Sequence, residues 1–157
     1  MNFWFVASLL QTYVQDSTIF LVRPKVHTRF GFGGLNHAEL IDIFKEKVQI
    51  SEIDRIADLW EFYKNNKTND LLNLAQTLQN KYPFILDAVD AHIQRIPHGN
   101  NPGRPIQALK EIMTDLGTEE FGPVFREFNR RESIYGFGDL QVRRLFDSIK
   151  NSGDSMK

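Results

Sequence analysis

Cysteine is absent from this chain of 157 residues. Without a thiol, the chain cannot form disulfide bonds, cysteine zinc sites or a thiolate nucleophile. The absence fits a reducing compartment, so we expect a cytoplasmic protein. An excess of one charge sign is also lacking, because the formal net charge is only −1. Overall charge therefore gives no reason to expect binding to nucleic acid or to an anionic membrane.

A long apolar run is lacking as well. The most apolar stretch, Met1–Leu10, is far too short to span a bilayer. It has no basic residues before its apolar part and no small-residue cleavage site after it, so it does not match a signal peptide. We interpret it as the start of a helix over residues 2–14 that is buried in the fold.

Sequence signatures of catalysis are missing. The chain has no G-x-S-x-G serine and no Walker A lysine. None of its four histidines belongs to an H-E-x-x-H zinc motif. His92 lies on the apolar face of a predicted helix, which favours a hydrogen-bonded core histidine over a general base. We therefore assign no catalytic residue, no metal ligand and no cofactor, and we lean against an enzyme.

A glycine-rich turn precedes the first helix of the middle region. Gly31, Gly33 and Gly34 lead to Asn36, which is placed to cap a helix, with Glu39 three residues later as in a capping box. Backbone N–H groups of such a turn can hold a phosphate, so these three glycines and Asn36 form a candidate anion site. The alternative is that the glycines only supply the positive φ of a tight turn.

A second glycine-rich turn, residues 135–139, leads to Asp139, predicted to cap the last helix. The three C-terminal helices suggest a helix-turn-helix, with the last one as the recognition helix. The candidate nucleic-acid contacts are Arg130, Arg131, Gln141, Arg143, Arg144 and Lys150. Against this, nearby carboxylates match the basic residues in number, and the connection between the last two helices is long for that motif.

Breaks in the pattern divide the chain. Residues 1–34 form a helix–strand piece, residues 35–97 a segment of four helices, residues 104–150 a three-helix subdomain, and residues 151–157 a disordered tail. The strongest break is Pro97–Pro105, with three prolines and two glycines. The predicted fold class is α+β and mostly α, with a C-terminal subdomain like a helix-turn-helix or winged helix.

The run Thr18–Val22 predicts a strand that is apolar on both sides, as in a central parallel strand. Lys25–Phe30 is its only candidate partner, and it is polar and basic. We therefore interpret the helix and strand as a remnant of an α/β sheet, with Met1 an internal start of a longer parent. We expect the isolated chain to self-associate, or to bind a protein partner, through this N-terminal helix and strand.

The order of these segments carries a family resemblance. Its elements are the helix Trp4–Tyr13, the strand Thr18–Val22, Gly31, Gly33, Gly34, Leu35, Glu39 and Leu40 of the turn and helix, the tryptophan helix with Trp60, a leucine-rich helix, a helix from Pro83-Phe84 to Pro97, and Gly138-Asp139. Together they resemble the C-terminal part of an uncharacterised bacterial family, domain of unknown function 1835, with its companion C-terminal domain. The resemblance implies a preceding α/β half with a ligand-binding segment that these residues do not include, so it assigns no site residue and no activity.

Three functions are consistent with these features. We expect a non-enzymatic interaction or regulatory module. One alternative is a winged-helix-like regulator that binds nucleic acid through the basic residues named above. A second is the C-terminal part of an enzyme that binds a small molecule or nucleotide, with the glycine turn as anion site.

Overall fold

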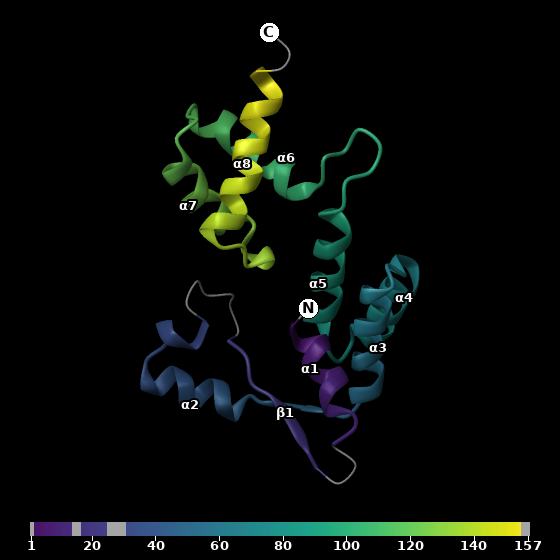
Figure 1. Cartoon of the computed structure of the whole chain (residues 1–157). Helices are drawn as coiled ribbons and strands as arrows, with labels where there is room; N and C mark the ends of the chain where they lie inside the picture. The colour runs from purple at the N-terminus through teal and green to yellow at the C-terminus, as the bar shows by residue number, and fades with distance from the viewer. Residues whose placement is uncertain (1, 14–16, 25–30, 155–157) are drawn as a thin grey trace. The chain divides into compact units, whose positions relative to one another are not determined.

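The computed structural model describes residues 2–13, 17–24 and 31–154 (Figure 1). This part contains eight α-helices and one two-stranded antiparallel sheet. The protein is therefore α+β and mostly α, as predicted. It divides into two compact units, unit 1 with residues 1–90 and unit 2 with residues 91–157. The boundary lies inside a helix, and the predicted break at Pro97–Pro105 falls within unit 2.

Unit 1 holds the sheet and most of the helices. Its elements are α1 (Asn2–Leu10), β1 (Ile19–Leu21), the 3-10 turn η1 (Gly31–Gly34), α2 (His37–Lys45), β2 (Val48–Ile50), α3 (Ile53–Lys64), α4 (Thr68–Leu78) and α5 (Pro83–Gln94), which continues into unit 2.

The core of unit 1 forms where α1 and α4 pack against α3. Trp4 and Ala7 of α1 are buried. The ring of Trp4 lies 6.2 Å from that of Tyr63, and the ring of Phe5 lies 5.2 Å from that of Trp60. The apolar N-terminal run is thus a packed helix, although only one of its faces is covered.

The sheet differs from the sequence prediction. β1 pairs antiparallel with β2, with Ile19 opposite Ile50 and Leu21 opposite Val48. The expectation of a central parallel strand, covered on both faces and with Lys25–Phe30 as its only candidate partner, is wrong. Phe20 is exposed, and the partner strand was hidden because Val48 also fits a helical stripe. The partner that was predicted, Lys25–Phe30, lies outside the described residues.

Tyr82 connects the sheet to the helices. Its side chain is fully buried just before α5. Its hydroxyl accepts a hydrogen bond from the Ser51 backbone N–H at 3.2 Å and donates one to the Gln49 carbonyl at 3.5 Å. A buried hydroxyl needs such partners, and these two position the end of β2.

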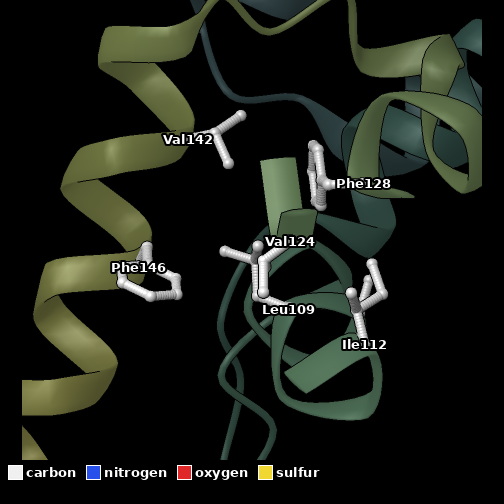
Figure 2. Close-up of a cluster of buried hydrophobic side chains, with 7 residues drawn as sticks. Leu109, Ile112, Val124, Phe128, Val142 and Phe146 are labelled. Carbon is white, nitrogen blue, oxygen red and sulfur yellow. The ribbon is translucent and has the colours of Figure 1, made fainter. Parts of the chain in front are cut away.

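Unit 2 is built from α6 (Arg104–Leu116), α7 (Phe121–Arg131), the 3-10 turn η2 (Ser133–Tyr135) and α8 (Asp139–Asp154). Figure 2 shows how side chains from the three helices point toward one another. The buried cluster consists of Ala108, Leu109, Ile112, Val124, Phe128, Val142 and Phe146. Three amphipathic helices bury their stripes together in this way because each has only one apolar face.

The ends of α8 differ from expectation. Asp139 is the first helical residue, and its Oδ1 accepts from the Leu140 N–H at 2.8 Å. The Gln141 side chain accepts from the Gly138 N–H at 3.0 Å, so it also helps to satisfy the start of the helix. At the other end the helix continues through residue 154. Residues 151–154, expected in a disordered tail, are therefore helical, and residues 155–157 lie outside the described part.

Candidate functional sites

The candidate anion site lies at the start of α2. Asn36 caps the helix as predicted, since its Oδ1 accepts from the Glu39 N–H at 3.1 Å. In return, the Glu39 Oε2 accepts from the Asn36 N–H at 2.7 Å, which completes the capping box. Gly31 has φ +54° and needs the freedom of glycine, whereas Gly33 has ordinary backbone and open space around it.

This arrangement disfavours a bound anion. The capping box already uses the N–H groups of Asn36 and Glu39, and it places the Glu39 carboxylate at the positive end of the helix dipole. A phosphate at that position would meet a negative charge. The geometry supports the turn-forming role for Gly31, whose φ is positive.

The candidate nucleic-acid residues lie on two helices of unit 2. Arg130 and Arg131 lie at the end of α7, and Gln141, Arg143, Arg144 and Lys150 lie on α8. All six are exposed. Whether the charged residues among them can bind a nucleic-acid backbone depends on whether carboxylates of the protein already neutralise them.

Glu127 neutralises the pair on α7. Its Oε2 accepts from Arg130 Nε at 2.8 Å, and its Oε1 accepts from Arg131 Nε at 2.6 Å. Arg131 also donates to Asp115 of α6 at 2.6 Å. Hydrogen bonds from Arg130 and then Arg131 hold the pKa of Glu127 at about 2, against a usual 4.5. The same contacts raise the pKa values of both arginines.

Charge pairs also occupy α8. The Lys150 ammonium lies 3.3 Å from a carboxylate oxygen of Glu119, and Arg143 Nε lies 3.8 Å from one of Asp147. The Arg143 guanidinium also lies over the Phe121 ring, 4.5 Å from its centroid. Such contacts reduce the positive potential that a DNA backbone would meet.

A winged helix needs a strand pair beside its recognition helix. Within residues 91–154, the β-type pairing is confined to a single bridge between His98 and Asn101, ahead of α6. The described part of unit 2 is thus a three-helix arrangement without a wing, so the winged-helix form of the prediction finds no support there.

Apolar side chains on the surface of unit 1 form a different kind of candidate site. The outer face of α1 exposes Phe5, Val6 and Leu9, followed by Tyr13 in the next turn, with exposed fractions between 43% and 83%. Phe5 and Leu9 are one helical turn apart on α1, and Tyr13 follows in the turn beyond the end of the helix. The sequence located this segment, predicting a helix buried in the fold and also a surface for self-association or a protein partner.

A second apolar surface lies on α2 and β1, and the sequence prediction included only its Phe20, in the strand Thr18–Val22. We define the α2 patch as Phe20, Leu40, Ile41 and Phe44, which are all exposed. The Lys47 ammonium connects its two aromatic rings, 5.4 Å from the centroid of Phe20 and 4.6 Å from that of Phe44. Leu40 and Phe44 also belong to the apolar stripe that the sequence of this helix shows.

Other chemistry finds little support in the described residues. They contain no group of three or more histidine, aspartate or glutamate side chains that could hold a metal ion. Burial, and then the charge of Arg95, lowers the pKa of His92, as suits a partly enclosed neutral histidine. His27 lies outside the described part. Among the helices that the structure describes, none is long and apolar enough to cross a membrane.

The chain is a mostly helical α+β protein with two exposed apolar surfaces in unit 1, one on α1 and one on α2 and β1. Comparison with known proteins adds no family, because no family model, no curated protein and no solved structure matches the chain.

Proposed function

We propose that this chain is a non-enzymatic interaction module of the bacterial cytoplasm, and that it binds a protein partner through the outer face of α1. One observation carries the proposal. α1 contains no charged residue, and Phe5, Val6 and Leu9 are exposed, as is Tyr13 just beyond the helix, whereas Trp4 and Ala7 are buried. Exposed apolar stripes of this kind are typical of surfaces that other proteins cover.

The chemistry of the stripe supports a protein partner over a charged ligand. An aromatic–aliphatic stripe with four-residue spacing is how a helix fills an apolar groove in a partner. Since no charge has to be desolvated, burying this face costs little electrostatic free energy. The bacterial source rests on the family resemblance, and the cytoplasm on the lack of cysteine.

The two alternatives have less support. A nucleic-acid regulator would need free positive charge, but carboxylates pair with Arg130, Arg131, Arg143 and Lys150. An enzyme that binds a nucleotide at the glycine turn would have to place the phosphate beside the Glu39 carboxylate.

Site-specific photocrosslinking of the full chain in bacterial cells tests the proposal. We expect a benzoylphenylalanine at position 9 to give a discrete adduct. The same probe at Asp70, an exposed position on α4, is the control and should give none. Adding Val6→Ser, which changes a neighbouring exposed side chain, should remove the adduct.

Two results would contradict the proposal. One is an absence of any adduct at position 9 above that at position 70. The other is turnover of a hydrolase or nucleotide substrate panel by the purified chain, abolished by one point change. The adduct's mass separates a different protein from a second copy of this chain.

A further inference from the structure

α2 lacks the tertiary packing that a helix of its length needs. It spans nine residues, and none of them is buried, although the whole helix is described. Isolated helices shorter than about 12 residues are marginal in water, even when they are well capped. The capping box at Asn36 contributes only about 1 kcal/mol. The helix therefore has the local signals of a stable element but not the covering surface.

The face that requires cover is the α2 patch. Leu40 and Phe44 are one helical turn apart and Ile41 adjoins them, while Phe20 of β1 joins through the Lys47 ammonium that lies over both rings. Phe44 is 59% exposed, the most of the four. The patch is therefore continuous across α2 and the sheet rather than scattered.

We propose that the α2 patch binds the α2 patch of a second copy of this chain, with the two helices antiparallel about a two-fold axis. Charge favours that partner. α2 has Glu39 in its first turn; near its end Lys45 pairs with Asp42 at 3.4 Å, and Lys47 follows Glu46. An antiparallel pair sets Glu39 of one helix beside Lys47 of the other, and it also aligns the helix dipoles favourably.

The available area fits a weak dimer. With about 200 Å² for a fully exposed large side chain, the patch offers about 400 Å² of apolar surface per copy. Since roughly 60% of an interface is apolar, two copies would bury about 1,300 Å² in total. That is near the lower limit for specific association, so we expect a reversible dimer with a Kd on the order of 10 µM.

This inference concerns a surface other than the outer face of α1, so either can fail alone. Sedimentation velocity of the full chain, from about 1 to about 200 µM, tests it. We expect a sedimentation coefficient that rises with concentration. Phe44→Ser should raise the dimer Kd at least about tenfold. Leu9→Ser is the matched control, because Leu9 is 52% exposed on α1, and it should leave the Kd unchanged.

A charge variant and a second readout sharpen the test. Glu39→Gln keeps a side chain that can complete the capping box but removes the charge, so it should weaken the dimer about twofold to fivefold and reduce its salt dependence. Amide exchange in residues 37–45 should slow as concentration rises, in the unmodified chain but not in Phe44→Ser. That readout detects the contact even if the substitution loosens α2.

Either of two outcomes would overturn the inference. The unmodified chain could remain a monomer throughout, with exchange in α2 independent of concentration. Alternatively, Leu9→Ser could abolish the dimer while Phe44→Ser leaves it intact, which would place self-association on α1 instead.

Discussion

The backbone entering α6 passes so close to Arg95, in the turn just after α5, that Gly103 has no room for a side chain. Its φ is +90° and its ψ is 149°, a combination outside the regions open to residues with a Cβ. A Cβ built there would lie 2.5 Å from the carbonyl oxygen of Arg95. That oxygen belongs to backbone, which cannot move aside as a flexible side chain could.

Gly103→Ala should therefore be strongly destabilising. A backbone conformation that only glycine tolerates costs about 1–3 kcal/mol, and displacing packed backbone adds a cost like that of overfilling a core. Together we expect a loss of about 3–4 kcal/mol in the free energy of unfolding of unit 2. Gly103 also accepts the first hydrogen bonds of α6, from the Ile106 and Gln107 N–H groups at 3.1 Å, so any shift there weakens the helix start.

Gly99→Ala is the matched control. Gly99 also has positive φ, +52°, but nothing lies within 4 Å of its Cβ position. The free energy of unfolding should therefore fall only by the cost of placing alanine in the left-handed region, about 1 kcal/mol. Urea unfolding followed by far-UV circular dichroism gives the free energies, and hydrogen exchange of peptides from α6 to α8 locates the loss in unit 2. Trp4 and Trp60, the two tryptophans, both lie in unit 1 and report on that unit separately. If Gly103→Ala cost no more than Gly99→Ala, the steric argument would be refuted.

Three further expectations concern charges in unit 2. Arg104 donates to the buried Glu132 at 2.9 Å, so Arg104→Met should lower the free energy of unfolding in urea by about 2–3 kcal/mol, because it leaves a buried carboxylate without a partner. Adding Glu132→Leu should restore much of that stability, and no recovery would contradict this explanation. Because the folded pKa of Glu127 is about 2 against 4.5, its stabilisation is present above pH 4.5 and is lost as pH falls toward 2. Carboxyl NMR titration measures this directly, and a midpoint near 4.5 would contradict it. In a mobility-shift assay at physiological salt we expect no specific DNA complex; if a saturable one formed, Arg143→Ala with Arg144→Ala should lower its salt slope by up to about two.

The exposed apolar residues show where the burial expected from the sequence pattern differs from the burial in the structure. Leu40, Ile43 and Phe44 have the spacing of a core-facing stripe, and Phe5 and Leu9 belong to an apolar run, so the sequence indicates burial for all of them. In the structure Phe5, Leu9, Leu40 and Phe44 are exposed. Periodicity reports which face of a helix is apolar, but whether another element covers that face depends on the rest of the fold.

Local interactions explain what the sequence determined by itself. The capping box at Asn36 joins residues only three positions apart, so its pattern is complete in the sequence. The mostly helical α+β class follows from amphipathic stripes in the same way. The pairing of β1 with β2 is different, because it joins Ile19 to Ile50 across about thirty residues, and three-residue strands carry little signal of their own. The ion pairs of unit 2 divide in the same way. Glu127 pairs with Arg130 and Arg131 at local helical spacing, whereas the pairs of Asp115 with Arg131 and of Glu119 with Lys150 join segments far apart in the sequence, so only the tertiary fold decides them.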